Sequence, residues 1–446
     1  MRFQFWRDFG RHLRFSGDDQ PERYRWLQRC WIVSWLLLLG VTWRLWLPPN
    51  EFPAVPVVPI AAFPAVLEWS LLVGVVTSLV VAGLTLGRRS AAVALWVFIG
   101  CGVALVVLNQ HRFQPWFYQA IILALLFATT DRRRALAAAG WLAIGVYFYS
   151  SLGKFDFQFI HTVGQQFLAT AAGLVGVNIE TWSEPLRWGA ALGFPIVELL
   201  VAIGLVFRST RQAAASLAIA MHAAVILLLS PLGLGHQPGV LAWNAAMIGQ
   251  ALVLFLWKPA AASRSADWSM AGGRQVALAS SALASRESVL LGPSWLALAV
   301  VWLAMLLPLT ERFGIWDHWP SWALYSPHSS RVRLQIHGSS AGKLPVAMRE
   351  RLSVADEQGW QTLPLDRWSI EALGVPLYPQ SRFQLGVAQW LVDRYKLDRG
   401  TRMHLRGAAD RWTGAREDEL VMGRMGIDHA SDRFWLNVQP RSVETR

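Results

Sequence analysis

One lysine in this sequence occupies a setting that could support acid–base chemistry. The chain has four lysines, and three of them (Lys258, Lys343 and Lys396) lie in polar stretches. Lys154 instead ends a long apolar run that begins at Trp141. An ammonium group there must find a partner or give up its proton, so Lys154 is a candidate base. The alternative is an interfacial lysine whose amine is hydrogen-bonded to lipid headgroups.

Two further ionisable residues lie inside apolar runs. Glu198 follows Pro195 in one run, and His222 lies in the middle of the next. A carboxylate or an imidazole near the middle of a bilayer is costly unless it faces a partner or a wet cavity. A proline within such a helix frees a backbone carbonyl and often accompanies a cavity. The candidate catalytic residues are therefore Lys154, Glu198 and His222. The alternative for the last two is a structural hydrogen bond between helices.

Polar side chains near Lys154 form a candidate binding surface. Gln158 and His161 follow Lys154 by four and seven residues, so a continuous helix would place all three on one face. The segments 108–119 and 231–244 add hydrogen-bonding groups in loops expected at the same end of the bundle. The alternatives are aromatic belt residues and an ordinary turn. The candidate substrate-binding residues are His111, Arg112, Gln114, Trp116, Gln158, His161, His236 and Asn244.

We expect the candidate residues to meet in one cavity. That cavity should be lined by Lys154, His161, Glu198, His222 and one of His111 and Arg112. Side chains that point in separate directions toward lipid would remove the case for an enzyme.

Composition indicates the elements that must position these residues. The chain is 54% hydrophobic and only 16% charged, and it contains 25 tryptophans over 446 residues, which a soluble domain does not sustain. The sequence predicts an all-α polytopic membrane bundle of about nine transmembrane helices. Segment 157–178 is less apolar and predicts an extracytoplasmic or re-entrant helix. The predicted spans lie near 28–47, 65–86, 91–108, 116–130, 136–153, 190–207, 213–230, 240–257 and 291–309.

Arginine placement orients the predicted bundle. Arginines gather in the N-terminal segment and in alternate loops, such as 132–134, whereas the loops between them carry a single arginine. The positive-inside rule then puts the N-terminus in the cytoplasm and everything after Glu311 outside, in the inner membrane. The net charge of +12 comes mostly from these arginines, which can contact anionic lipid at the cytoplasmic surface. We therefore expect lipid contact and no nucleic-acid partner.

The chain divides into four predicted parts. A basic cytoplasmic segment (1–27) precedes the bundle (28–310), whose loop 259–289 is rich in Ala, Ser and Gly and typical of a flexible linker. A connector rich in Trp and Pro (311–330) leads to a small extracytoplasmic α+β domain (331–446). We expect that domain to cover the outer cavity or to bind a peptide or protein. Its predicted strands lie at 331–337, 403–407 and 434–440, and its predicted helix at 381–397.

The segment YFYSSLGKFDFQFI around Lys154 resembles a family motif. Vitamin K-dependent gamma-carboxylases have a similar stretch of aromatic residues, small residues, lysine and aspartate. The region 25–310 is also similar to the horizontally transferred transmembrane domain (HTTM) proteins of bacteria and, more loosely, to DoxX- and MauE-like membrane proteins. The resemblance implies that Lys154 is the base that starts hydroquinone oxygenation, with a quinone or hydroquinone as the ligand. It also matches His222, less specifically, to a histidine found in these bundles.

The tail after residue 310 is smaller than the lumenal region of the carboxylases, and no propeptide-binding segment is recognisable in it. Carboxylation of a protein is therefore not expected, and the resemblance implies either another carboxylase-like enzyme or a quinone-linked lyase or oxidoreductase. The competing hypothesis is a non-catalytic scaffold or assembly subunit of the DoxX/MauE-like kind, in which Lys154 anchors a lipid or a partner helix.

Cysteine and histidine usage argues against two other activities. The two cysteines, Cys30 and Cys101, do not form a CxxC pair, so a thiol–disulfide relay is not expected. The ten histidines are scattered without HxH or HxxxH spacing, so no metal site is predicted.

Overall fold

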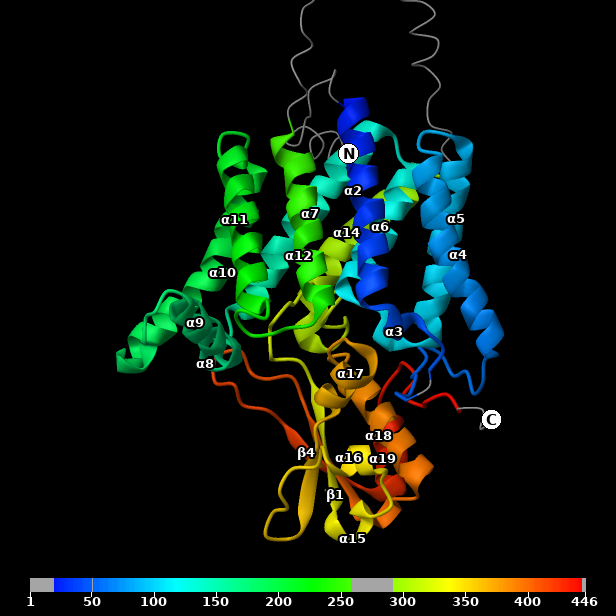
Figure 1. Ribbon diagram of the computed structural model, residues 1–446, viewed down its shortest axis with the longest axis vertical. Coiled ribbons are helices and arrows are strands. Elements are labelled where there is room, and N and C mark those ends of the chain that lie inside the picture. Colours follow the sequence, from blue (N-terminus) through cyan, green and yellow to red (C-terminus); the bar gives the residue numbers. More distant parts are fainter. Residues whose placement is uncertain (1–19, 50, 258–291, 443–446) are drawn as a thin grey trace, which may run out of the picture.

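The structure is a computed structural model that describes residues 20–49, 51–257 and 292–442. Most of the basic segment 1–27 and the whole loop 259–289 lie outside these described residues. The described chain forms a bundle of long helices with a smaller α/β unit at one end (Figure 1).

Seven of the described helices are long and apolar enough to cross a membrane. They are α4 (Ala65–Leu84), α5 (Arg89–Leu108), α7 (Arg132–Lys154), α10 (Glu184–Val206), α11 (Arg211–Leu229), α12 (Pro238–Ala251) continued by the π-helical η3 (Leu252–Leu256), and α14 (Ser294–Leu306) continued by the 3₁₀ helix η4 (Leu307–Phe313). The prediction of a helical bundle whose helices can span a membrane is thus confirmed.

The other two predicted spans also coincide with helices, α2 (Gln20–Val41) and α6 (Pro115–Thr129). α6 has only 15 residues, and α2 carries three arginines in its first half. The short helix α3 (Trp43–Trp46) follows α2. The number of spans and the orientation of the bundle therefore remain predictions.

Helix α7 is the most enclosed of the seven spanning helices. Asp131 begins it by accepting a hydrogen bond from the Arg134 backbone N–H at 3.0 Å. Small side chains such as Ala138, Ala139 and Ala143 are buried along it and allow neighbouring helices to approach closely. α10 packs directly against α7, which brings Glu198 beside Lys154.

The prediction of one helical face running from Lys154 through Gln158 and His161 is wrong. α7 ends at Lys154, and two short helices follow, α8 (Phe157–His161) and α9 (Val163–Leu174). Asp156 breaks the helix because its carboxylate caps α8, accepting from the Gln158 N–H at 2.9 Å, and pairs with Arg312 at 2.8 Å. α8 and α9 lie to the side of the bundle, at the end that carries the α/β unit (Figure 1).

The C-terminal unit is built on a four-stranded antiparallel sheet. Its order is β2 (Trp360–Leu363), β1 (Arg331–His337), β3 (Thr401–Arg406) and β4 (Asp418–Met422). Leu334 on the central strand pairs with Leu363 on one side and Met403 on the other. The helices of this unit are α15 (Gly338–Ala341), α16 (Val346–Arg349), α17 (Leu365–Leu373), α18 (Ser381–Tyr395) and α19 (Gly423–Ser431); the 3₁₀ turn η5 spans Asp398–Gly400.

The structure confirms the predicted strands at 331–337 and 403–407 and the predicted helix at 381–397. The strand predicted at 434–440 is wrong. Its apolar–polar alternation arises because the segment packs against the loop before α4, where Asn437 donates to the Pro56 carbonyl at 2.9 Å. The two edge strands of the sheet, β2 and β4, were not predicted from the sequence.

The C-terminal unit is fastened to the bundle by buried polar contacts. Arg382 of α18 pairs with Asp317 of the connector and donates to the Gln110 side chain at 2.9 Å. Arg441 pairs with Glu68 of α4 at 3.0 Å. The connector is itself enclosed, since Trp322 is fully buried and donates to the Ala304 carbonyl at 3.2 Å.

Candidate functional site

A cavity of about 1070 Å³ lies where the bundle meets the connector and the C-terminal unit. Helices α7, α9, α10, α11 and α12 supply most of its wall, and the connector, α17 and the start of α6 are among the segments that complete it. Apolar and aromatic side chains dominate the wall, including Trp116, Trp243 and Trp319. A large apolar cavity with a few polar groups is the usual form of a ligand site.

Lys154 and Glu198 form a buried ion pair on this wall. The lysine Nζ lies 2.9 and 2.8 Å from the two carboxylate oxygens and donates also to the Ser150 hydroxyl at 2.7 Å. Lys154 is 3% exposed and Glu198 17% exposed, so the carboxylate is the more accessible partner. The Ser151 hydroxyl donates to the Pro195 carbonyl at 2.7 Å and fixes α7 against α10 beside the pair.

A second polar group on the cavity wall links three helices. The Asn244 amide nitrogen donates to the Val240 carbonyl at 2.9 Å, which leaves its oxygen to accept from His222 Nδ1 at 2.8 Å. His222 Nε2 is then an acceptor, and the Tyr147 hydroxyl donates to it at 3.0 Å. The hydrogen bonds thus assign one tautomer to His222 and hold it in place.

The polar face of α7 explains why these groups meet. Tyr147, Ser150 and Lys154 follow one another at spacings of three and four residues, so they lie on one side of the helix, and all three line the cavity. Sequence reasoning did not select Tyr147 and Ser150, because tyrosine and serine are common in membrane helices. Their three-and-four spacing from Lys154 was the available signal.

Of four further predicted residues, three line the cavity and one does not. Trp116, His236 and Asn244 line it together with the catalytic candidates. His161 is not among the lining residues of the described chain. Its Nδ1 lies 2.8 Å from the Phe157 carbonyl, and its ring stacks on Phe157 with centroids 3.9 Å apart. The turn between α7 and α8 carries it away from Lys154.

Gln158 likewise lies outside the cavity lining described by the structure. Its amide donates to the Gly414 carbonyl of the C-terminal unit at 3.0 Å. Its observed contact is therefore with the C-terminal unit.

His111, Arg112 and Gln114 form a structural joint on the far side of the cavity wall, and none is among its lining residues in the described chain. His111 Nε2 donates to the Pro376 carbonyl at 2.8 Å, and burial lowers the pKa of His111 to about 4. Arg112 donates to the carbonyls of the α2–α4 loop and pairs with Glu68 at 2.6 Å. Gln114 donates to the His111 carbonyl at 2.8 Å. The expectation that His111 or Arg112 shares the cavity is wrong, because His111 bonds to the C-terminal unit and Arg112 bonds to the segment between α2 and α4 and to Glu68.

The arrangement can exchange a proton with a bound ligand. Moving one proton along the 2.8 Å hydrogen bond from Lys154 to Glu198 converts the ion pair into a neutral amine and a carboxylic acid. A low-dielectric wall reduces the cost of that transfer, because it penalises the separated charges. The His222–Tyr147 hydrogen bond offers a further polar contact on the same wall.

The chain matches no known protein family, no curated protein and no solved structure.

Proposed function

We propose that this protein is an integral inner-membrane enzyme that binds a lipid-soluble, quinone-like substrate and uses Lys154 as its base. The observation that carries the proposal is the Lys154–Glu198 pair on the wall of a large, mostly apolar cavity. The resemblance of the Lys154 segment to the gamma-carboxylase and HTTM proteins supports the same assignment. The proposal keeps the orientation predicted from the arginines: the N-terminus is cytoplasmic, nine helices cross the bilayer and the C-terminal unit is extracytoplasmic.

The cavity suits a ligand with an aromatic ring, an ionisable hydroxyl group and an oily chain. Its tryptophans offer flat apolar surfaces, and Lys154, Glu198 and His222 place ionisable groups on the wall formed by α7, α10 and α11. When bound, a hydroquinone would supply an acidic hydroxyl and a redox-active ring. Lys154, as the neutral amine, takes the hydroxyl proton, and Glu198 holds the proton that the lysine released. Residues of α17 and the connector line the cavity, which supports a lid role for the C-terminal unit.

The test uses menadiol, a soluble hydroquinone, with the purified protein in lipid nanodiscs. Quenching of Trp fluorescence under anaerobic conditions measures binding, because Trp116, Trp243 and Trp319 line the cavity. Menadiol consumption in air measures turnover. We expect saturable binding to the wild-type protein. We also expect Lys154→Met and Lys154→Arg to slow turnover about a hundredfold or more while binding persists.

Gly193→Trp provides the matching test of the cavity. Gly193 lines the cavity and has free space where a side chain would be added, so a tryptophan there should fill the cavity and abolish quenching. Gly100→Trp on α5 is the control, since that exposed glycine also has free space but lies outside the lining. Equal menadiol consumption by the wild-type protein and by Lys154→Met would contradict the enzyme.

The second candidate function is the non-catalytic scaffold, and the bidentate pairing of Lys154 with Glu198 is the observation that favours it. In a scaffold, the sole role of such a pair is to hold α7 against α10. The reversed variant Lys154→Glu with Glu198→Lys keeps the attraction and moves the amine to the other helix. A scaffold keeps its assembly in that variant, whereas an enzyme keeps its fold and loses turnover.

A further inference from the structure

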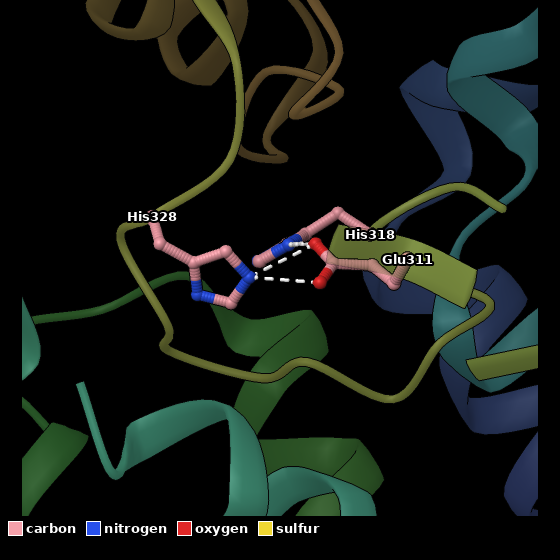
Figure 2. A group of neighbouring side chains, drawn as sticks. All are labelled: Glu311, His318 and His328. Atoms are coloured by element: carbon pink, nitrogen blue, oxygen red, sulfur yellow. Dashed lines mark hydrogen bonds and ion pairs between the residues drawn. The ribbon is translucent and has the colours of Figure 1, made fainter. Parts of the chain in front are cut away.

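Two histidines and a glutamate form a compact cluster next to the cavity (Figure 2). Glu311 lies in η4, and His318 and His328 lie in the connector that follows. His318 Nδ1 is 2.8 Å from one oxygen of Glu311, and His328 Nε2 is 2.9 and 3.0 Å from its two oxygens. Both imidazole side chains are almost fully buried, and the carboxylate is 9% exposed.

The other nitrogen of each ring is committed to an acceptor outside the cluster. His318 Nε2 lies 2.8 Å from the Ser326 carbonyl, which can only accept, so this nitrogen carries a hydrogen. The Ser326 hydroxyl donates its one hydrogen to the Gly153 carbonyl. It must therefore accept from His328 Nδ1, which lies 2.7 Å away. Both outward nitrogens are thus donors.

These outward bonds leave each neutral ring with a lone pair directed at the Glu311 carboxylate. Lone pairs that face a carboxylate repel it unless a proton or a cation lies between them. One added proton would relieve only one of the two contacts. Two added protons would leave the buried cluster with a net positive charge wherever they bind, and buried charges that lack a matching partner are costly. One divalent cation relieves both contacts at once.

We propose that Glu311, His318 and His328 bind one divalent transition-metal ion, with zinc as the best match. Two imidazoles and one carboxylate are a ligand set that zinc uses when it keeps an open position. The donation of each outward N–H to a protein acceptor is the arrangement that orients histidine ligands in metal sites. The three ligand atoms all lie within 4.8 Å of one another, so one ion can reach all of them with small side-chain shifts.

The surroundings suit a bound cation and connect it to the cavity. Arg312, next to Glu311 in the sequence, is directed to Asp156, with which it pairs at 2.8 Å. His318 and Ser326 line the cavity, so the open position of the ion can face it. Trp322 and Tyr325, which lie between the two histidines, have left-handed backbone angles of φ 59° and 57°, and such strain persists where surrounding contacts fix a loop for a purpose.

This site departs from the expectation of no metal that the histidine spacing gave. His318 and His328 lie seven and seventeen residues after Glu311 in an irregular connector, and no short motif describes that arrangement. The site stands independently of the proposed base, since neither Lys154 nor Glu198 is one of the three ligands.

The test measures zinc on the full chain, purified without a polyhistidine tag, stripped with chelator and then titrated with Zn²⁺. We expect one equivalent of zinc on the wild-type protein. His318→Ala and His328→Ala should each weaken binding about a hundredfold or more, and Ser326→Ala should weaken it about tenfold through lost orientation of His328. His404→Ala is the matched control, because His404 also faces a carboxylate, Asp418 at 2.9 Å, but without a second histidine.

Zinc-edge X-ray absorption of the loaded wild-type protein gives a readout that needs no variant. Two imidazole nitrogens and carboxylate oxygen in the coordination shell are the expected result. Absence of zinc uptake by the wild-type chain, a shell without histidine, or unchanged affinity in folded His318→Ala and His328→Ala proteins would each overturn the proposal.

Discussion

At the scale of single residues, the Lys154–Glu198 pair determines how the bundle tolerates substitution. Both groups are largely withdrawn from water, and each neutralises the other. Removing one partner of a buried pair leaves an uncompensated charge, whereas replacing both by apolar residues is often neutral or stabilising.

We therefore predict that Glu198→Gln destabilises the protein by about 3 kcal/mol, because Lys154 is left without its countercharge. The double variant Lys154→Met with Glu198→Leu should recover most of that loss. Unfolding in mixed micelles with increasing SDS measures the free energy of unfolding of the wild-type protein, the single variant and the double variant. Arg134→Ala serves as the control, since its pairing with Asp131 is exposed and worth only about 0.5 kcal/mol. A double variant that is no more stable than Glu198→Gln would show that the pair does not interact.

Arg112 is a second residue whose environment sets its role. Its guanidinium is fully buried, donates to the carbonyls of Leu45 and Leu47, and pairs with Glu68. Arg112→Ala should destabilise the fold by about 3–5 kcal/mol, since those groups lose their partner without gaining water.

The same unfolding measurement on Arg44→Ala gives the comparison for Arg112. Arg44 is exposed, and its hydrogen bond to the Glu371 carbonyl is long, at 3.4 Å. Its removal should change stability by less than about 0.5 kcal/mol. Similar losses for the two arginines would contradict the structural joint assigned to Arg112.

At the scale of elements, the joint between the bundle and the C-terminal unit should respond to pH. His111 lies in this joint, and burial lowers its pKa from 6.5 to about 4. Between those values the unfolded chain binds a proton that the folded chain does not, so stability falls as pH falls. The loss begins below about pH 6.5 and reaches about 3 kcal/mol near pH 4.

Thermal unfolding at pH 7.5 and pH 5 tests this expectation. His111→Gln keeps a donor for the Pro376 carbonyl and removes the titrating ring, so it should flatten the dependence. His404→Gln, at a partly exposed histidine outside the joint, should leave the slope unchanged. An unaltered slope in His111→Gln would show that this histidine does not couple folding to pH.

The elements also show how far the sequence could predict the structure. Long apolar runs interrupted by arginine-rich turns predicted the helices of the bundle, and alternation predicted β1 and β3. Alternation failed at 434–440, where the segment packs against a loop by contacts between residues far apart in sequence. The change of direction after Lys154, which takes Gln158 and His161 off its face, was also missed, because it depends on the Asp156 cap and on Arg312, which is distant in sequence.

The candidate site was likewise predicted only in part from the sequence. Lys154, Glu198 and His222 could be found from sequence because each is an ionisable residue in an apolar run, and all three line the cavity. His111 and Arg112 were predicted at the cavity because their loop was expected at the same end of the bundle as Lys154, but their side chains are bonded elsewhere. The Glu311, His318 and His328 cluster could not be found, since only the folded connector brings its members together.

At the scale of the whole molecule, the proposed orientation places the two ends of the bundle on opposite sides of the membrane. The C-terminal unit and Lys154 lie at one end, and the arginine-rich turn at 132–134 lies at the other (Figure 1). Without Cys30 and Cys101, a single cysteine at the highly exposed Val354 should react with an impermeant maleimide in intact spheroplasts. A single cysteine at Arg133 should react only after lysis. The reverse pattern, or equal labelling, would contradict the orientation.

The most direct measurement of the central claim is mass spectrometry of the molecules released from the purified protein. The cavity should retain an amphiphile that carries an ionisable hydroxyl, enriched over bulk membrane lipid in the wild-type protein and in Gly100→Trp. Gly193→Trp, which fills the cavity, should lose that molecule. The same ordinary phospholipids in equal amounts from all three proteins would contradict a lipid-soluble substrate held beside Lys154.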